Sequence, residues 1–174
     1  PYLAGTSEPI RPNQVEFINQ RLIINSGRGE FYFSELASTK FYRNDDINLQ
    51  NFYSAESNAD ALQVIKVVGN RIWLFGERSY EIWSATGTQN TDPFSFMQGS
   101  ATGIGVQSER SVANIDTSVF FLGSSDSGIN TVFYSNGMNN PQRISTNALE
   151  NTFSEIDDPK GAIGFCYYTE GHTF

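Results

Sequence analysis

The chain has 174 residues, and its 19 acidic residues outnumber the 11 basic ones, giving a formal net charge of -8. Phosphate binding relies on clustered Lys and Arg, whereas the basic residues here are scattered singly, which argues against direct, large-footprint DNA binding. Hydrophobic residues make up 39% of the chain, enough for a core, and no apolar run approaches the roughly 18 to 20 residues of a membrane span.

Short runs of β-favouring residues alternate along the chain with clusters of Gly, Ser, Thr and Asn. This pattern is typical of an all-β chain with many turns, and it leaves one short stretch with helical character, residues 147–153. In chain order, the runs that predict strands are 15–24, 30–34, 62–68, 71–76, 80–83, 111–115, 118–122, 131–134 and 161–169.

These runs form a repeat of a strand, a tight turn, an apolar strand, a polar turn and an aromatic strand. Three units align on Arg21, Arg71 and Ser118, at spacings of 50 and 47 residues, and a fourth begins near Phe165 and stops unfinished at Phe174. Four-stranded units about 40 to 50 residues apart indicate the blades of a β-propeller, because a twisted sheet cannot bury both faces alone. The alternative is a β-sandwich whose hairpins happen to look alike.

The repeat therefore predicts one all-β domain over residues 1–174, built as a partial propeller of antiparallel four-stranded blades. Its repeats lie near residues 15–60, 61–110 and 111–160, with a partial one from 161. Three blades and a fragment fall short of the usual minimum for closure, so we expect the chain to be an excised portion of a longer protein.

No combination of residues in the sequence makes a convincing catalytic or cofactor site. His172 is the only histidine, so a Ser-His-Asp triad would depend on it alone. Gly103-Ile104-Gly105 resembles the start of a dinucleotide fingerprint, but Ser108 stands at the third glycine position, and a turn explains the motif better. Cys166 is the only cysteine and lies among aromatic residues, which predicts an inert buried thiol.

The acidic residues give equally weak signals for metal binding or glycoside hydrolysis. The loop 124–130 offers oxygen ligands for calcium but lacks the spaced acids of an EF-hand. A glycosidase needs two facing carboxylates, for which Glu77 and Glu81 are nominal candidates. Two adjacent acidic pairs, Asp45-Asp46 and Asp157-Asp158, are expected in loops. Three aromatic residues could stack on sugars but more naturally pack in a core: Tyr42, Phe52 and Tyr53. We therefore expect no catalytic residue, no cofactor and no metal.

An ordered series of motifs resembles the phage stabilisation protein family, whose members complete the head–tail junction of short-tailed phages. The resemblance covers most of the chain from about Asp60 onward. Its pieces are Leu74-Phe75-Gly76-Glu77-Arg78-Ser79-Tyr80-Glu81-Ile82-Trp83, Thr86-Gly87, Asp92-Pro93-Phe94, Gly103-Ile104-Gly105, Ser111-Val112-Ala113, Phe120-Phe121-Leu122-Gly123, Arg143-Ile144-Ser145-Thr146 and Glu170-Gly171-His172-Thr173-Phe174.

The resemblance implies a non-enzymatic tail hub or plug of the virion that closes the portal channel and stabilises packaged DNA in the head. It implies several copies around the tail axis, host cytoplasm during assembly, and partners among the portal and adaptor ring, the tail needle or fibre, and the tailspikes. A channel plug needs no basic groove, so the acidic balance fits, with no sequence-specific nucleic-acid binding and no membrane. The alternative function is a carbohydrate-binding or glycan-cleaving β-propeller.

Overall fold

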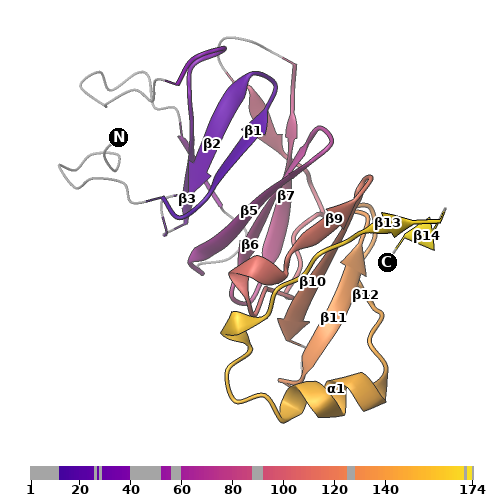
Figure 1. The fold of residues 1–174 in the computed structure, drawn as a ribbon. Helices are drawn as coiled ribbons and strands as arrows, with labels where there is room; N and C mark the ends of the chain where they lie inside the picture. The colour runs from indigo at the N-terminus through magenta and orange to yellow at the C-terminus, as the bar shows by residue number, and fades with distance from the viewer. Residues whose placement is uncertain are drawn as a thin grey trace.

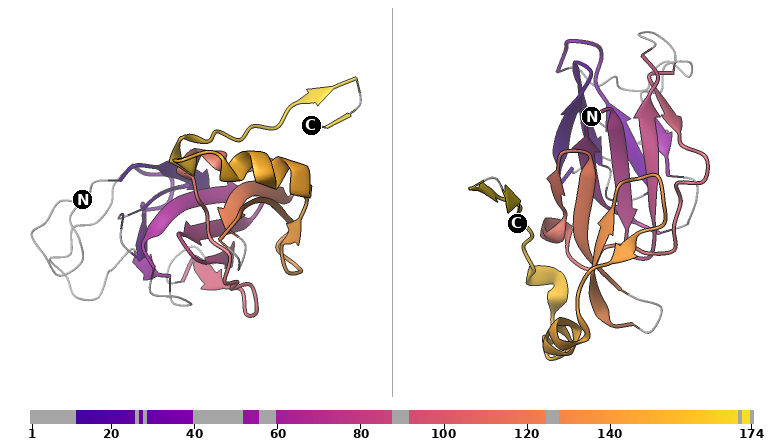
Figure 2. Two further views of the ribbon diagram at one scale, coloured as in Figure 1. Left: turned by 90° about the horizontal axis from the view of Figure 1, so that it is seen from below. Right: turned by 90° about the vertical axis from the view of Figure 1, so that its right-hand side faces the viewer.

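The computed structural model describes residues 12–25, 27, 29–39, 52–55, 60–87, 92–124, 128–170 and 172–173, with the side chains of Phe52, His172 and Thr173 excepted. Three antiparallel four-stranded sheets follow one another along the chain and stand side by side (Figures 1 and 2). In each sheet the strands are adjacent in the order in which they occur in the sequence. Each sheet is therefore a simple meander.

The strand bounds are as follows. The first sheet contains β1 (Val15–Ile18), β2 (Arg21–Asn25), β3 (Glu30–Phe33) and β4 (Phe52–Ser54). The second contains β5 (Leu62–Val68), β6 (Arg71–Gly76), β7 (Tyr80–Ala85) and β8 (Phe94–Phe96). The third contains β9 (Ala113–Ile115), β10 (Ser118–Ser124), β11 (Asn130–Ser135) and β12 (Gln142–Arg143).

The remaining elements lie before and after the third sheet. A 3₁₀ turn, η1 (Glu109–Ser111), precedes β9, and helix α1 (Asn147–Ser154) follows β12, with the Thr146 hydroxyl accepting from the Leu149 amide at its N-cap. A second 3₁₀ turn, η2 (Pro159–Gly161), leads into an extended segment and a small hairpin of β13 (Tyr168–Thr169) and β14 (His172–Thr173). No helix in the described part of the chain has the length and hydrophobicity to cross a membrane.

The first two strands of each sheet are joined by a turn of two residues. The residue pairs that flank these turns are Ile18 with Arg21, Val68 with Arg71, and Ile115 with Ser118. In every case the first turn residue has a left-handed backbone, with φ of 46° at Asn19, 61° at Gly69 and 51° at Asp116. Asn, Gly and Asp adopt this conformation at the least cost, so local chemistry places a two-residue hairpin in each sheet. In the first turn Gln20 is left-handed as well, with a φ of 63°.

The hydrophobic core consists of two layers, one on each face of the second sheet. Ile72 and Leu74 of β6 face the first sheet and pack with Ile23 and Phe31, among others. The alternate residues of β6, Trp73 and Phe75, face the third sheet and pack with a second group that includes Val119, Phe121 and Phe133. The middle sheet is thus covered on both faces, as a blade is in a propeller.

The predicted all-β, propeller-like architecture is confirmed, although the three sheets do not close into a ring within the described residues. A sandwich would pair two sheets across one core, whereas here the second sheet contributes to two. The predicted helix near 147–153 is also confirmed.

Several predicted strand bounds differ from the structure. The run 15–24 is divided by the turn at Asn19, and the strand expected over 111–115 begins at Ala113 because η1 occupies the residues before it. Most of the run 161–169 is extended without pairing in a sheet, and only Tyr168–Thr169 forms a strand. The outermost strands β4, β8 and β12 are two or three residues long, too short for a periodic pattern to reveal them.

The first prediction tests the layer between the first two sheets. Ile72 is completely buried there, so Ile72→Ala should lower the free energy of unfolding by about 2–5 kcal/mol through lost burial and the cavity left behind. Val15→Ala is the matched control, because Val15 is 62% exposed in β1 and should change stability by no more than about 0.5 kcal/mol. Urea unfolding of both variants measures the difference, and equal effects would contradict the two-layer core.

Candidate interaction surface on the third sheet

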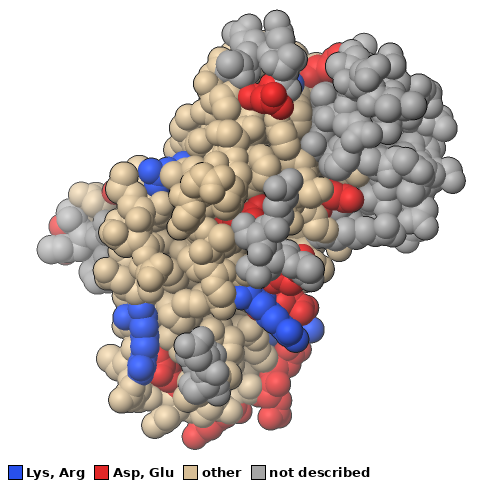
Figure 3. All heavy atoms as spheres, turned by 180° about the vertical axis from the view of Figure 1, so that it is seen from behind, with Lys and Arg blue, Asp and Glu red and all other residues tan. Residues whose placement is uncertain are grey.

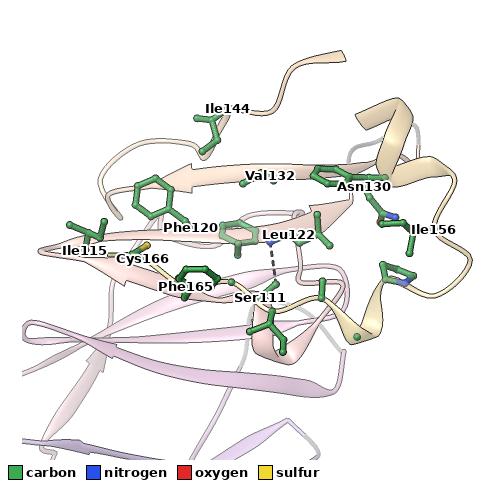
Figure 4. Close-up of a pocket in the computed structure, with 18 of the residues that line it drawn as sticks. Ser111, Ile115, Phe120, Leu122, Asn130, Val132, Ile144, Ile156, Phe165 and Cys166 are labelled. Carbon is green, nitrogen blue, oxygen red and sulfur yellow. Dashed lines mark hydrogen bonds between the residues drawn. The ribbon is translucent and has the colours of Figure 1, made fainter. Parts of the chain in front are cut away.

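An apolar groove of about 910 Å³ lies on the face of the third sheet that points away from the second. Phe120 and Leu122 of β10 and Val132 of β11 form its floor (Figure 4). Ile156, just beyond α1, and the extended segment containing Phe165 border it. Phe120 and Leu122 are only half-buried, whereas their neighbours Val119 and Phe121 are buried against the second sheet. The third sheet therefore has a second apolar face that no sheet covers in the described structure.

Helix α1 is held beside this groove by a charged cluster at the edge of the third sheet. The Arg143 guanidinium donates from Nε and Nη2 to the two carboxylate oxygens of Glu150, at 2.6 and 2.7 Å, and also contacts Asn147. The Ser145 hydroxyl donates to Oε1 of Glu150 at 2.7 Å. Bidentate geometry makes this a strong charge-assisted contact that fixes the helix to β12.

These donors also set the ionisation of Glu150. The Ser145 hydroxyl lowers the pKa of the carboxyl most, the Arg143 guanidinium lowers it further, and partial desolvation opposes both, so that the pKa lies below its ordinary value of 4.5. The carboxylate is consequently charged at neutral pH. The motif Arg143-Ile144-Ser145-Thr146 thus combines two donors to Glu150 with the N-cap of α1.

The segment that follows η2 is fixed to the other side of the groove. The Ser108 hydroxyl lies 2.9 and 2.7 Å from the carbonyl oxygens of Lys160 and Ala162, and the Gly164 amide donates to the Arg110 carbonyl at 2.9 Å. A Cβ at position 164 would overlap the backbone of Ser111, so only glycine allows this close approach. Cys166 lies further along the same segment, where burial raises the pKa of its thiol, and it is half-buried where full burial was predicted.

The glycine motif at residues 103–105 joins the second and third sheets. Gly105 lies against the backbone of Glu77 and Arg78, where a Cβ would overlap both residues. Val106 next to it donates to the Gly76 carbonyl at 2.9 Å, and Gln107 donates to the Leu122 carbonyl at 2.9 Å. The motif is therefore a close-packed connection between sheets, and the structure does not support a nucleotide loop there.

A polar pocket of about 820 Å³ lies at the same junction. Its charged lining contains the cations Arg78, Arg110 and Lys160 together with the carboxylates Glu77 and Glu109. On the face shown in Figure 3, Lys and Arg side chains likewise lie in small separate groups among Asp and Glu. Because basic and acidic side chains lie close together, that face has no continuous basic stripe to which a nucleic-acid backbone could bind.

The nominal catalytic carboxylates are not brought together as a hydrolytic pair. Glu81 is 3% exposed and accepts from Trp83 Nε1 at 2.7 Å, on the face of β7 that packs toward the first sheet. Glu77 is exposed in the turn before β7 and lines the polar pocket. Asp157 and Asp158 are exposed, and Asp158 accepts from the Lys160 amide at the start of η2. The pair Asp45-Asp46 lies outside the described residues.

The remaining candidates have structural roles or lie where the structure is not described. The Tyr53 ring packs against Phe31, Phe33, Trp83 and Phe94, and burial together with Asp92 raises its pKa to about 12. The backbones of Phe52 and His172 lie in β4 and β14, while Tyr42 and residues 125–127 of the loop considered for calcium are outside the described residues. Among the described residues, no three His, Cys, Asp or Glu side chains cluster as a metal site would require.

The groove itself was not predicted, although β10 carried a signal for it. Val119, Phe120, Phe121 and Leu122 are consecutive apolar residues, and a strand that is apolar on both faces is buried on both faces in a finished fold. The Arg143–Glu150 contact left no comparable signal, because it depends on how α1 folds back on the sheet.

Comparison with known proteins identifies one family over almost the whole chain. The family model described as "Bacteriophage P22 Gp10, beta-propeller" matches residues 8–173, a span that includes all three sheets, α1 and the hairpin of β13 and β14. No curated protein matches the chain.

The second prediction concerns the glycine connection. Gly105→Ala should destabilise the protein by about 1–3 kcal/mol, because the new methyl group must push apart the connection and the turn before β7. Gly103→Ala is the matched control from the same motif, since a Cβ at Gly103 meets nothing within 4 Å. Thermal unfolding monitored by circular dichroism compares the two, and equal melting temperatures would contradict the close approach at Gly105.

The third prediction follows from the lowered pKa of Glu150. A carboxyl whose pKa is lower in the folded state stabilises the protein above its ordinary pKa of 4.5, and this contribution is lost as the pH falls through the folded value. Glu150→Gln should therefore lower the melting temperature at about pH 7, and the difference from the parent protein should shrink as the pH falls below 4.5. Glu155→Gln, just after α1 and exposed, serves as the control. A pH-independent difference for Glu150→Gln would refute the assignment.

Proposed function

The chain belongs to the phage stabilisation family, and from this premise we propose that it is a non-enzymatic tail protein that closes the portal channel and stabilises packaged DNA in the head. The observation that carries the proposal is the family match over residues 8–173. The family is one of phage structural proteins, so the chain is a component associated with the virion.

The construction of the chain supports a mechanical role. Rigid closure of a channel requires elements that transmit force without local opening, and sheets stacked through two apolar layers provide such elements. Connections such as the one at Gly105 bring backbone directly against backbone between neighbouring sheets. The candidate carboxylates Glu77 and Glu81 lie in different environments, which supports a role without hydrolysis.

The proposed partners follow from the position of such a plug. The protein would bind the portal and adaptor ring on one side and the tail needle or fibre and the tailspikes on the other, in several copies around the tail axis. Assembly would take place in the host cytoplasm. The net charge of -8 supports contact with proteins and not with DNA phosphates. The carbohydrate-binding alternative is weaker, because the ring of Tyr53, one of the residues that could stack on a sugar, packs within the first two sheets.

The fourth prediction is assembly with the head–tail junction. We expect the protein to join rings of portal and adaptor from the same phage, as an added density below the adaptor in negative-stain class averages. The Gly103→Ala variant, altered only where a Cβ meets open space, should join them equally well. Absence of the added density at micromolar protein, together with binding on a glycan array or glycan turnover, would replace the proposal with the carbohydrate alternative.

A further inference from the structure

We propose that Asn136 is a site of spontaneous covalent modification, at which the backbone nitrogen of Gly137 displaces ammonia from the Asn136 side chain. The product is a cyclic succinimide, which water opens to aspartate or isoaspartate. Asn136-Gly137 is the only Asn-Gly pair in the sequence, and it lies in the loop between β11 and β12. The hydrogen bonds of this loop and its packing against the second sheet support the proposal, which does not depend on the function proposed above.

Packing against the second sheet requires a glycine after Asn136. The backbone of Gly137 is left-handed, with a φ of 72°. A Cβ at this position would lie 2.9 Å from side-chain atoms of Arg71, Trp73 and Ile82, so a larger residue would force this contact apart. The loop therefore places an amide nitrogen that carries no neighbouring side chain directly after a side-chain carboxamide. The reactive pair is a consequence of how the loop packs.

Two hydrogen bonds fold the Asn136 side chain back over the peptide units that follow it. Its Oδ1 accepts from the backbone amides of Met138 at 3.0 Å and of Asn139 at 3.4 Å. A carboxamide bound in this way brings its Cγ toward the intervening nitrogen of Gly137. The two amides also donate to the oxygen on which negative charge develops when Cγ is attacked, which is the arrangement of an oxyanion hole.

The peptide unit that reacts is held by two further contacts. Nη1 of Arg71 donates to the Asn136 carbonyl at 2.9 Å, and the Gly137 amide donates to Oγ of Ser135 at 3.2 Å. When the Gly137 nitrogen loses its proton, negative charge spreads to the carbonyl oxygen of the same peptide unit. The Arg71 guanidinium lies on that oxygen and stabilises the charge. Because both reacting groups are held, little conformational freedom remains to be lost on ring closure.

The reaction needs water and no other reactant. Asn136 and Gly137 are half-buried and Met138 is 76% exposed, so solvent reaches the loop. A base from solvent removes the proton of the Gly137 nitrogen, a bond forms from that nitrogen to Cγ of Asn136, and the bond from Cγ to Nδ2 breaks as Nδ2 takes up a proton and leaves as ammonia. The net change converts an amide and water into a carboxyl group and ammonia, without oxidation or reduction.

The two products have different consequences for the fold. Hydrolysis of the ring at Cγ restores the normal backbone with an aspartate side chain, whose oxygens can accept from the same two amides. Hydrolysis at the backbone carbonyl gives isoaspartate, in which the main chain runs through Cγ and is one carbon longer. Gly137 lies too close to the completely buried Trp73 ring for the loop to absorb this extra carbon in place. Isoaspartate should therefore loosen the contact between the second and third sheets.

Incubation of the folded protein at mildly alkaline pH tests the proposal. We expect the peptide that contains Asn136 to gain the mass of one amide-to-acid conversion in mass spectrometry. It should also incorporate heavy oxygen from isotope-labelled water and become a substrate for protein isoaspartyl methyltransferase. Asn147, which is exposed and precedes Ala148, is the control within the chain. Absence of conversion at Asn136, or conversion of Asn147 at the same rate, would overturn the proposal.

The contribution of the fold is measured by the rate of conversion. We expect Asn136 to convert at least about fivefold faster in the folded protein than in the same protein unfolded in urea, because only the folded loop supplies the amide donors and the guanidinium. This comparison needs no variant. A folded rate equal to or below the unfolded rate would overturn the proposal.

Substitution of Arg71 tests its contact with the reacting peptide unit. Arg71→Gln should slow conversion in the folded protein by at least about threefold, and Arg71→Lys should retain most of the rate through its positive charge. Arg78→Gln is the matched control, because Arg78 is exposed and bears on a different pocket. Circular dichroism checks that each variant is folded. If folded Arg71→Gln converts as fast as the parent protein, the proposal is overturned.

A last measurement separates the two products. Asn136→Asp represents the aspartyl product and should keep the melting temperature and tryptophan emission of the parent protein. The isoaspartyl fraction, separated chromatographically from aged protein, should melt at a lower temperature. Its emission should shift to longer wavelength as the Trp73 ring becomes exposed, while Trp83, the other tryptophan, stays buried in the first layer. An isoaspartyl fraction with unchanged melting and emission would overturn the proposed effect on the contact between the sheets.

Discussion

The second and third sheets are each apolar on both faces, and the rest of the structure depends on that constraint. Along β6 successive side chains point to opposite faces of the sheet. Ile72 and Leu74 point toward the first sheet, and Trp73 and Phe75 point toward the third. Neither face can be left to water without losing about 25 cal/mol for each Å² of apolar surface exposed. A sheet of this composition therefore needs a neighbour on each side. Serial stacking follows, and so does close packing of the connections, as at Gly105.

A sheet that is apolar on both faces raises a problem of register. In an ordinary half-buried sheet, a slip by one residue moves the apolar side chains to water, and this cost fixes the pairing. In β6 a slip would exchange one apolar set for another, so the side-chain pattern alone specifies the register weakly. The tight turns fix the register instead, because a left-handed residue at Asn19, Gly69 or Asp116 favours a two-residue loop between the paired strands. The turn thereby decides which residues face which neighbour.

Much of the fold could be predicted because the features that define it are local. Turn residues such as Gly69-Asn70 and the apolar run of β6 lie within a few positions of each other, and their recurrence reveals the repeat. The short outer strand β12 pairs only because β11 already lies beside it, so its sequence carries no signal of its own. The Arg143–Glu150 contact depends on α1 folding back on the sheet, and for that reason it could not be derived from motifs, whereas the four consecutive apolar residues of β10 carried a partial signal for the groove.

For the proposed plug, the negative charge means that the protein retains the DNA in the head without binding its phosphates. A basic surface would attract the phosphates and would have to release them before the DNA could leave. An acidic chain offers no such attraction, and its repulsion extends only about 8 Å at physiological ionic strength, so retention must come from steric closure. In the polar pocket, Arg78 and Arg110 are accompanied by Glu77 and Glu109, which limits local attraction as well. The stability of such a closure then depends on contacts between sheets and between subunits, and its opening requires no protein–DNA contact to be broken.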